Sequence, residues 1–519
     1  MPDYDILLIG LGPVGATAAI MLAESGLRVA AVERDEEVYR LPRAVNLDGE
    51  IIRALQRFGR GETVAGLMQA VRPGDRAGFA NARREWMFGS QSSDFGANGW
   101  QPMNMFDQPE FEGYLREQAL AHANVTGFIG YEVTDLIDHG EEVLVGAKPL
   151  IEENQHDALQ LTGRYAIGCD GASSFVRKTL GAGWQDLGYD HEWLVVDVTV
   201  KQGHTLNNDT VQVCDPSRIT TYVCTKDPYR RWEFKMLPGE SSDHMLRSET
   251  IHTLIEPWTP RDTYEIRRAA VYQFHAATAD RWRVGNVFIA GDAAHQTPPF
   301  LGQGMNTGMR DVINLSWKLP LVFSGTAADE LLDTYFAERE PHAHDLVDWA
   351  VSIGRLMDHL TEVERAKQQG ETPPETPPRL KAAGYGQGRE QPPLRGGAIR
   401  LDQVSDTGST GYLFSQPIVT NPQGGQLRMD ELLGPGFAVV GKAPEDLAVS
   451  EDARLVLAKL NAQYVCLEGL ETVRGHFDRL FREYDAAIIR PDRIVYGHTT
   501  ASLTLSELAI SLGQQLTLN

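Results

Sequence analysis

The sequence predicts an α/β protein that combines a parallel sheet, an antiparallel sheet and a small C-terminal α/β module. Three observations support this fold class. The chain opens with a strand, a glycine turn, a helix and a second strand, which is the order of a parallel βαβ unit. Segments rich in Val, Thr and aromatic residues fill the middle of the chain, and alternating strand and helix patterns return near the C-terminus.

The composition is that of a folded globular protein with about three domains. Hydrophobic residues make up 42% of the 519 residues and charged residues 23%. The net charge of −23 disfavours a nucleic-acid partner. The four cysteines form no CxxC pair, and neither a signal-peptide pattern nor a run of about 18 apolar residues is present. We therefore expect no metal site, no membrane span and a cytoplasmic protein.

The first βαβ unit predicts a dinucleotide site. An apolar strand at 4–9 leads into Gly10-Leu11-Gly12-Pro13-Val14-Gly15, a helix at 16–25 and a second strand that ends at Glu33. Gly10 permits the tight turn, Gly12 lets the backbone approach a pyrophosphate, and Gly15 allows close helix–strand packing. The helix N-terminus offers N–H groups to phosphates, and the Glu33 carboxylate suits ribose hydroxyls. This motif alone does not distinguish NAD from FAD.

The later elements follow from hydrophobic patterns and turn residues. A buried strand is expected at 286–290, with helical patterns at 310–324 and 329–337. Pro-Pro pairs at 373–374, 377–378 and 392–393 indicate that residues 370–397 form a linker or surface arm and build no helix or sheet interior. Residues 413–519 then alternate strands and helices. The antiparallel sheet is predicted from segments 193–201, 210–213, 219–224 and 231–236.

Two further segments resemble the flavin fingerprints of the single-component (class A) FAD-dependent aromatic hydroxylases. Residues 165–177 are similar to the Asp-Gly fingerprint, and residues 287–295 with their continuation through 311 are similar to the Gly-Asp fingerprint. Segments 42–50, 214–216 and 231–240 also resemble the 3-(3-hydroxyphenyl)propionate hydroxylase family. Asp48-Gly49-Glu50 departs from that family's usual Asp-Asp-Glu, which bears on the substrate more than on the reaction.

The resemblance implies a domain organisation. A Rossmann-like FAD-binding domain of the para-hydroxybenzoate hydroxylase type is expected at 1–185 and 275–360, with a substrate-binding β-sheet domain at 186–274. A Pro/Gly-rich linker at 361–400 then leads to a thioredoxin-like domain at 401–519, whose signature resembles residues 490–495. Without a CxxC pair, that domain is expected to serve packing or oligomer contacts.

The resemblance also implies a reaction. NAD(P)H reduces FAD, the reduced flavin forms a C4a-hydroperoxide with O2, and a phenolic substrate similar to 3-(3-hydroxyphenyl)propionate is hydroxylated ortho to its hydroxyl, giving a catechol. Only one dinucleotide fingerprint is present, so NADH or NADPH is expected as a transient visitor, and the choice between them stays open. The family implies a homodimer. Two alternatives remain: a tailoring monooxygenase for a larger aromatic polyketide or other phenol, including Baeyer–Villiger oxidation, and a binding protein on a degenerate flavoprotein scaffold.

Candidate catalytic residues must help to ionise a phenol, whose pKa near 10 lies above working pH. His295 either assists that ionisation or holds the flavin loop, and Tyr222 either faces the substrate or packs in the core. Pro299 is expected beside the flavin rings, and His275 is a weaker candidate base. Arg218, Arg230 and Arg231 could bind a substrate carboxylate, although a solvated strand edge would also explain them.

Asp292 ends a buried strand, where its carboxylate could hydrogen-bond the flavin ribityl chain. The turn at 302–306 opens a helix whose N–H groups can face the flavin O2/N1 edge. The family carries an Arg near the flavin at Arg43 and a polar FAD contact at Gln118, which could equally be an exposed helix residue. The predicted cofactor contacts are Gly10, Gly12, Pro13, Gly15, Glu33, Arg34, Arg43, Gln118, Asp170, Asp292, Gly302, Gly304, Met305 and Asn306.

Overall fold

The computed structural model describes residues 2–41, 43–93, 95–150, 158–383, 391–421, 424–477 and 480–518. Pro42 of the segment at 42–50 and residues 384–390 of the predicted linker lie outside the described residues. The predicted α/β class is confirmed, with two large sheets and a smaller C-terminal sheet. None of the described helices is both long enough and apolar enough to cross a membrane.

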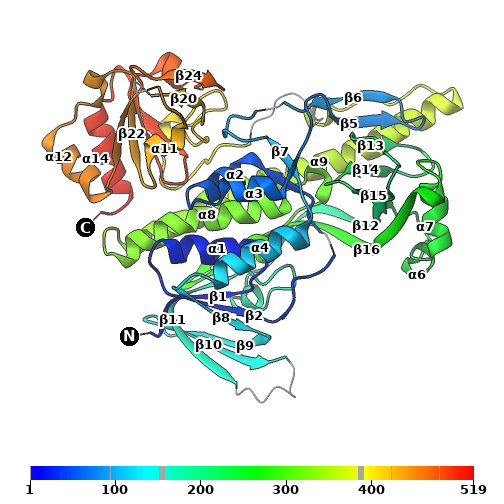
Figure 1. Cartoon of the computed structure of the whole chain (residues 1–519), viewed down its shortest axis with the longest axis horizontal. Coiled ribbons are helices and arrows are strands. Elements are labelled where there is room, and N and C mark those ends of the chain that lie inside the picture. The colour runs from blue at the N-terminus through cyan, green and yellow to red at the C-terminus, as the bar shows by residue number, and fades with distance from the viewer. Residues whose placement is uncertain are drawn as a thin grey trace.

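The first large sheet has a core of five parallel strands, most of which are formed by buried apolar runs. In spatial order they are β18 (Val287–Ile289), β11 (Leu159–Gly168), β1 (Tyr4–Ile9), β2 (Val29–Glu33) and β8 (Val125–Ile129). The strands β17 (Arg283–Val284), β9 (Tyr131–Asp138) and β10 (Val143–Pro149) extend this sheet in antiparallel pairing. The helices α1 (Pro13–Glu24), α4 (Gln108–Leu120) and α8 (Gly304–Phe323) lie together on one side of it (Figure 1).

The second large sheet is antiparallel except for one parallel pair, β13 with β5. Its spatial order is β19 (His295–Gln296), β16 (Tyr264–Ala279), β12 (Trp184–Val200), β15 (Tyr229–Lys235), β14 (Thr220–Cys224), β13 (Thr210–Cys214), β5 (Arg76–Asn81) and β6 (Trp86–Gln91). One face, here called the outer face, packs on α6 (Ser242–Met245) and α7 (Ser248–Ile255). The inner face packs on α9 (Thr334–Gln369) and on the turn η3 (Pro299–Leu301).

A three-stranded sheet joins the two large ones. It consists of β3 (Asn46–Asp48), β7 (Met103–Met105) and β4 (Gln69–Ala70), and α2 (Gly49–Gln56) and α3 (Gly61–Leu67) follow β3 along the chain. Short elements complete this half of the molecule, namely α5 (Phe175–Thr179), η1 (Arg261–Thr263), η2 (Gly291–Ala293) and η4 (Asp329–Asp333).

The C-terminal module, residues 411–518, is a mixed sheet covered by helices, as the thioredoxin-like prediction requires. Its strands lie in the order β23 (Gln463–Cys466), β22 (Ala438–Gly441), β25 (Ala486–Ile489) and β26 (Val495–His498), and only β22 and β23 are parallel. A side sheet contains β21 (Gln426–Arg428), β20 (Ile418–Thr420) and β24 (Glu471–Arg474). The helices are α11 (Met429–Leu433), η6 (Pro444–Leu447), α12 (Glu451–Lys459), α13 (Leu480–Glu483) and α14 (Leu505–Gln515).

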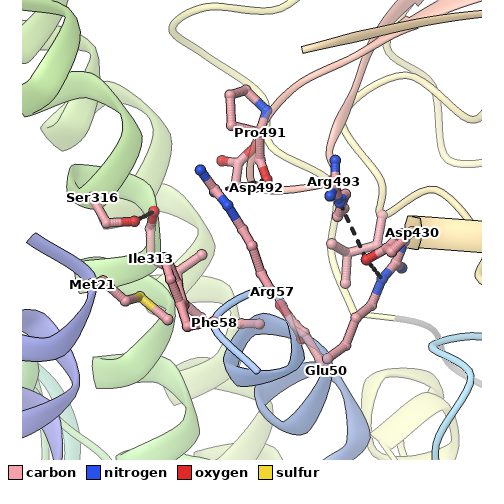
Figure 2. Close-up of a pocket in the computed structure, with 13 residues that line it drawn as sticks. Met21, Glu50, Arg57, Phe58, Ile313, Ser316, Asp430, Pro491, Asp492 and Arg493 are labelled. Carbon is pink, nitrogen blue, oxygen red and sulfur yellow. Dashed lines mark hydrogen bonds and ion pairs between the residues drawn. The ribbon is translucent and has the colours of Figure 1, made fainter. Parts of the chain in front are cut away.

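The C-terminal module meets α2 and α8 at a cavity of about 30 Å³, which Arg57 enters from the end of α2 (Figure 2). Arg53 donates to both oxygens of Asp430, at 2.9 and 2.7 Å, and Arg493 lies 3.2 Å from the same carboxylate. All three side chains are buried. The module is therefore joined to the rest of the molecule by paired buried charges.

The predicted linker contains more structure than its proline content indicated. Helix α9 continues to Gln369, and a short helix α10 (Pro378–Ala383) packs along it through Leu380. Pro378 starts α10, where the missing N–H has no intrahelical partner to lose. An Arg379–Asp348 ion pair of 2.5 Å ties α10 to α9. The expectation that this stretch builds no helix was wrong over these residues, and the domain boundaries themselves stay predictions.

Candidate active site

The three glycines of the first turn lie in different surroundings. A Cβ on Gly10, whose φ is +92°, would lie 2.5 Å from the carbonyl oxygen of Cys169, and one on Gly15 would collide with the carbonyl oxygen of Gly10. A Cβ on Gly12 would meet none of the described residues within 4 Å. Gly10 and Gly15 therefore serve packing, whereas Gly12 and the α1 N-terminus that it begins face open space.

Glu33 ends β2 beside this turn. Its Oε2 accepts the N–H of Leu11 at 2.6 Å, and its Oε1 accepts the N–H of Asp35 at 2.8 Å. The buried Arg116 of α4 approaches the carboxylate at 3.6 Å, and its Nε has no hydrogen-bond partner within the described part of the chain. Sequence reasoning missed Arg116, because an arginine in a helix gives no signal of burial.

Gln118 and Arg34 form no hydrogen bond or ion pair with Glu33 among the described residues. Gln118 lies two residues after Arg116, and helix positions two apart do not share a face. It is half-buried. Arg34 is exposed and pairs with Asp35 at 3.3 Å. Their predicted contacts with a cofactor stay predictions.

Asp170 fixes the turn on the other side of Gly10. Its carboxylate accepts the Ser174 hydroxyl at 2.5 Å and the N–H of Val176 at 3.0 Å, which caps α5. The Asp170 carboxylate thus stabilises the start of α5, and its contact with a cofactor stays a prediction.

A second helix N-terminus converges on the first. A Cβ on Gly308 of α8 would lie 2.8 Å from Cα of Gly291 and 2.8 Å from Val14 of α1, so α1, η2 and α8 touch one another. A Cβ on Gly304, the first residue of α8, would meet nothing within 4 Å, and Gly302 has a φ of +63°. Met305 is half-buried in the first turn of α8.

Asp292 lies in η2, where these elements meet. Its side chain reaches solvent, yet the surrounding protein raises the pKa of its carboxyl by desolvation, and the charges of His295 and Arg43 oppose that shift. Asp292 is thus a carboxylate that solvent can reach although protein surrounds it, and it lies next to two open helix N-termini. This arrangement is typical of a site that holds a polar ligand.

His295 is fully buried and helps to hold η2 in place through Asp311. Asp311 Oδ2 accepts from His295 Nε2 at 2.8 Å and from the N–H of Gly291 at 3.0 Å, while Asp311 Oδ1 accepts from Arg339 at 3.0 Å. His295 has no exposed surface through which to meet a substrate. The geometry therefore supports the loop-holding alternative, whereas the role of His295 as a catalytic base stays a prediction.

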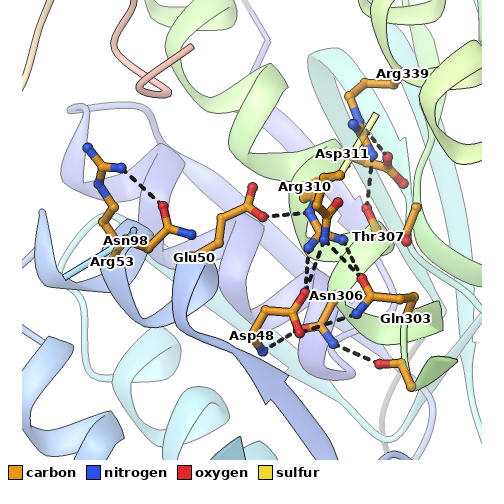
Figure 3. A network of polar contacts seen from close by, with 12 residues as sticks. Asp48, Glu50, Arg53, Asn98, Gln303, Asn306, Thr307, Arg310, Asp311 and Arg339 are labelled. Atoms are coloured by element: carbon orange, nitrogen blue, oxygen red, sulfur yellow. Dashed lines mark hydrogen bonds and ion pairs between the residues drawn. The ribbon is translucent and has the colours of Figure 1, made fainter. Parts of the chain in front are cut away.

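A polar network clamps the Asn46–Asp48 strand to the start of α8 (Figure 3). Arg310 donates to Asp48 at 2.6 Å and to Glu50 at 2.9 Å. The Asn306 side chain accepts the N–H of Asp48 at 2.9 Å and donates to the carbonyl of Asn46 at 3.2 Å. A Cβ on Gly49 would collide with the carbonyl oxygen of Gln101. The close approach of the Gln101 backbone therefore explains why residue 49 is a glycine here, where the resembled family usually has an aspartate.

Arg43 is held beside this network from two directions. Gln108 of α4 accepts the N–H groups of Arg43 and Ala44, at 3.0 and 2.7 Å. Arg231 of β15 donates to the carbonyl of Arg43 at 2.7 Å. The Arg43 side chain is exposed and lies over the Tyr39 ring at 4.5 Å. Gln108 was missed by sequence reasoning, because its spacing matches no motif.

Tyr222 and His275 lie away from this junction. Tyr222 points to the outer face of the sheet, donates to the carbonyl of Asn207 at 2.6 Å and stacks on Trp258 at 5.3 Å. These contacts favour the packing alternative for Tyr222, and its catalytic role stays a prediction. His275 is exposed on β16, 3.5 Å from Asp190.

The three arginines proposed for a substrate carboxylate each have a carboxylate of their own in the protein. Arg218 pairs with Glu240 at 2.5 Å, Arg230 pairs with Asp227 at 2.8 Å, and Arg231 pairs with Asp197 at 2.7 Å. Pro299 opens η3, whose Phe300 packs on Trp193 of the inner face at 5.3 Å.

Comparison with known proteins agrees with this geometry. The model of a family described as "FAD binding domain" matches residues 3–350, more than half of the chain. A probable NADH-specific resorcinol 4-hydroxylase of Rhodococcus jostii (strain RHA1) is 30% identical over 531 residues, which cover 98% of this chain and 94% of that protein. The chain belongs to the FAD-dependent aromatic hydroxylases.

Other members of this hydroxylase family match over nearly the whole chain. The 3-(3-hydroxy-phenyl)propionate/3-hydroxycinnamic acid hydroxylase of Escherichia coli O139:H28 (strain E24377A / ETEC) is 29% identical over 539 residues, 98% of this chain and 94% of its own. The crystal structure of aklavinone-11 hydroxylase with FAD and aklavinone has a TM-score of 0.80 at 23% identity and covers 99% of both chains, which shows the shared fold. An "HcaD C-terminal domain" family matches residues 411–514.

The residues of this flavoprotein fit FAD. A pyrophosphate needs a glycine without a clashing Cβ at a helix N-terminus, which Gly12 supplies. A ribose needs a carboxylate at the end of the second strand, which Glu33 supplies. The Nε of Arg116, which has no hydrogen-bond partner among the described residues, lies nearby. The flavin edge needs N–H donors without a blocking side chain, which the α8 N-terminus at Gly304 supplies.

Proposed function

We propose that this hydroxylase uses NADH and O2 to add a hydroxyl group to a small phenol, at the carbon next to the existing hydroxyl. The observation that carries the proposal is the convergence of the α1 and α8 N-termini with Asp292, beside the inner face of the antiparallel sheet. Curated relatives of similar length are named for hydroxylation of resorcinol and of 3-hydroxyphenylpropionate, and the first is named NADH-specific.

Each part of FAD has a counterpart among the described residues. When bound and reduced, FAD supplies the activation of dioxygen for transfer of one oxygen atom to an electron-rich ring. The protein would hold the pyrophosphate at Gly12, the adenosine ribose at Glu33, the ribityl chain at Asp292 and the flavin edge at the N–H groups of Gly304 and Met305.

The remaining task of the protein is to place the phenol and exclude water. The inner face of the sheet would form one wall of that space, and η3 with Phe300 would form another. These two walls would exclude water from the reaction and would fix which ring carbon of the phenol is presented for hydroxylation.

The test is a set of phenols scored by product formed per NADH oxidised. We expect purified protein to bind FAD, to oxidise NADH faster than NADPH, and to convert a single-ring phenol such as resorcinol or 3-(3-hydroxyphenyl)propionate. Protein that takes up no FAD, or oxidises NADH without product from any phenol, would contradict the proposal. Exclusive conversion of a multi-ring phenol, or formation of a lactone, would support the polyketide-tailoring alternative. The homodimer stays a prediction, which light scattering tests.

A further inference from the structure

The inner face of the antiparallel sheet carries three rows of side chains across the strands. The first row contains Arg231, Asp197 and Arg268, and Arg231 donates to the carbonyl of Arg43. The third row contains Lys235, Trp193 and Tyr272, and Trp193 packs on Phe300. The middle row contains Gln212, Thr221, Glu233, Val195 and Ala270. Adjacent rows are about 7 Å apart, because two residues along a strand separate them.

Glu233 therefore lies between the two segments that would border the flavin. One row away along β15, Arg231 holds the Arg43 backbone, and one row away in the other direction, Trp193 holds Phe300 of η3. The Glu233 side chain points to the same face as both. Its side chain thus points from the inner face of the sheet between the contact of Arg231 with the Arg43 loop and the contact of Trp193 with η3.

The protein leaves this carboxylate with little hydrogen bonding. The Glu233 side chain is 5% exposed, and among the described residues its one ion-pair partner is Arg231, at 3.9 Å. Its lateral neighbours do not satisfy it, because Val195 is apolar and the Thr221 hydroxyl donates to Gln212 at 2.5 Å. A carboxylate accepts up to about four hydrogen bonds, and burying it without them is costly.

We propose that Glu233 accepts the hydroxyl hydrogen of the phenolic substrate and takes its proton during hydroxylation. In this step the phenol O–H bond breaks, its electron pair stays on the phenolate oxygen, and a new O–H bond forms on Glu233. The proton later passes to solvent water, so Glu233 returns to its ionised form. The assignment rests on the proposed phenol hydroxylation and names the base that the sequence had sought in His295 and Tyr222.

The location of Glu233 also selects the substrate class. Arg231 and Arg268 are balanced in charge by Asp197, with which both pair, and by ionised Glu233, so this wall offers no excess positive charge to a substrate carboxylate. A hydroxyl group can donate to Glu233, whereas a substrate carboxylate would meet it as a like charge. We therefore expect a neutral di- or polyhydroxylated aromatic ring, with one hydroxyl on Glu233, to be preferred over a carboxylated phenol.

The charges around Glu233 agree with a proton acceptor near neutral pH. Burial and Asp197 raise the pKa of Glu233 to about 7, while Arg231 and Arg268 act in the opposite direction. Among the described residues, this face carries further titratable groups. Tyr272 of β16 hydrogen-bonds Arg268, and Lys235 of β15 pairs with Asp358 of α9. Tyr189 and His191 of β12 and Cys214 of β13 complete the set, and burial raises the pKa of Tyr189 and of Cys214 and lowers that of His191. A base with this pKa is ionised above pH 7 and can still be protonated by a phenol.

The experiment compares wild-type holoenzyme with Glu233→Gln, Glu233→Asp and the control Glu240→Gln. Glu240 belongs to the Arg218 ion pair away from the middle row, so the control makes the same chemical change outside the site. With resorcinol as the probe, we expect kcat/KM of the wild type to rise with pH through about 7. Glu233→Gln should lose at least 100-fold in kcat/KM and lose that pH dependence, Glu233→Asp should recover part of both, and Glu240→Gln should match the wild type.

Two readouts besides turnover accompany the kinetics. Resorcinol binding, followed by the change in flavin absorbance, should weaken at least tenfold in Glu233→Gln, whereas FAD affinity should not change. Apo-protein melting at pH 8 should be unchanged or higher in Glu233→Gln, because removing a poorly paired buried charge relieves its desolvation cost. A lower melting temperature together with lost FAD would show a structural role and overturn the assignment.

The outcomes separate this inference from the proposed function. If the wild type converts resorcinol and Glu233→Gln keeps its rate and pH profile, Glu233 is not the base, although the protein is still a phenol hydroxylase. If the wild type binds FAD but forms product from no phenol, the proposed function itself fails. A wild type that prefers 3-(3-hydroxyphenyl)propionate to resorcinol in kcat/KM would overturn the inference about substrate charge.

Discussion

At the scale of single residues, the glycines of the first turn separate folding from cofactor binding. Gly12 has a φ of −65°, which any residue can adopt, and open space in front of its Cα. We expect Gly12→Ala to change the free energy of unfolding of the apo-protein by less than about 1 kcal/mol. The added methyl group occupies the approach of the pyrophosphate, so FAD affinity should fall at least tenfold, about 1.4 kcal/mol.

The matched control for Gly12→Ala is Gly113→Ala on α4. A Cβ there also meets nothing within 4 Å, and the residue lies inside a helix. Alanine should therefore stabilise the protein by up to about 1 kcal/mol and leave FAD binding intact. Flavin fluorescence titration of both variants makes the comparison, and equal FAD affinity in Gly12→Ala and wild type would refute the role of Gly12.

His295 gives a second test at this scale, because its two interpretations predict different losses. If His295 only supports η2 through Asp311, His295→Ala should lower stability by about 1–3 kcal/mol, the cost of an unsatisfied buried partner, and weaken FAD binding. Once saturated with FAD, the variant should keep the wild-type pH profile. Normal stability and FAD affinity with a 100-fold loss of kcat would restore the acid–base role.

Residue-level prediction from sequence succeeded for motifs and failed for orientation. The alternation in 231–236 predicted a strand, but periodicity cannot say which set of side chains faces the flavin. Tyr222 therefore became a candidate and Glu233 did not, although the structure places Tyr222 on the outer face and Glu233 on the inner one. Long-range partners such as Asp311 for His295 have no local signal at all.

At the scale of elements, α2 links the flavin side of the molecule to the C-terminal module. Its first turn carries Glu50, which binds Arg310, and its second carries Arg53, which binds Asp430. The pKa of Asp430 is held at about 2 by Arg53 and Arg493 against the opposing effect of burial. Because this pKa is lower in the folded than in the unfolded state, Asp430 stabilises the fold above pH 3.8, and that contribution is lost as pH falls towards 2.

We expect Asp430→Asn to cost about 3–5 kcal/mol at pH 7, because it leaves two buried arginines without their carboxylate. The variant should also lose stability less steeply than wild type between pH 4 and pH 2. Glu62→Gln is the control, since Glu62 is exposed and pairs with Arg428 across the same boundary, and it should cost less than about 1 kcal/mol. Urea unfolding at several pH values measures both, and equal costs for the two variants would contradict the buried-joint argument.

Prediction of helices and strands was strongest where an apolar run is continuous. It was weakest where a proline begins a helix and where a charged side chain is buried. The strand predicted at 4–9 is β1, and the second predicted strand, which ends at Glu33, contains β2. Both lie in the middle of a parallel sheet and have a continuous apolar run at their centre. The helix α10 was missed because proline normally ends a helix, whereas here it begins one. Arg116 was missed because only the folded sheet shows that its helix face is covered.

At the scale of the whole molecule, one buried cluster connects α8, α9 and the C-terminal module. Glu338 of α9 binds Lys318 of α8 at 2.9 Å and Arg490 of the module at 2.8 Å, and all three are fully buried. Arg490 and Lys318 hold the pKa of Glu338 at about 2 against burial, and burial lowers that of Lys318 to about 8. Trp317 reports on the same joint, because it packs on Phe437 at 5.5 Å and donates to Asp492 at 3.1 Å.

These contacts predict that the module and the flavin-binding part unfold together. The sequence places all nine tryptophans before residue 350. Tryptophan fluorescence therefore follows the first part, with Trp317 reporting on the joint as well, and calorimetry follows both parts. In wild type the two transitions should coincide. Arg490→Met leaves Lys318 as the remaining ion-pair partner of Glu338, so the joint should weaken by about 3–5 kcal/mol. The module should then melt in an earlier calorimetric transition, which only the tryptophans at the joint, such as Trp317, follow in fluorescence. Coincident transitions in both proteins, with unchanged stability, would show that Arg490 does not couple the two parts.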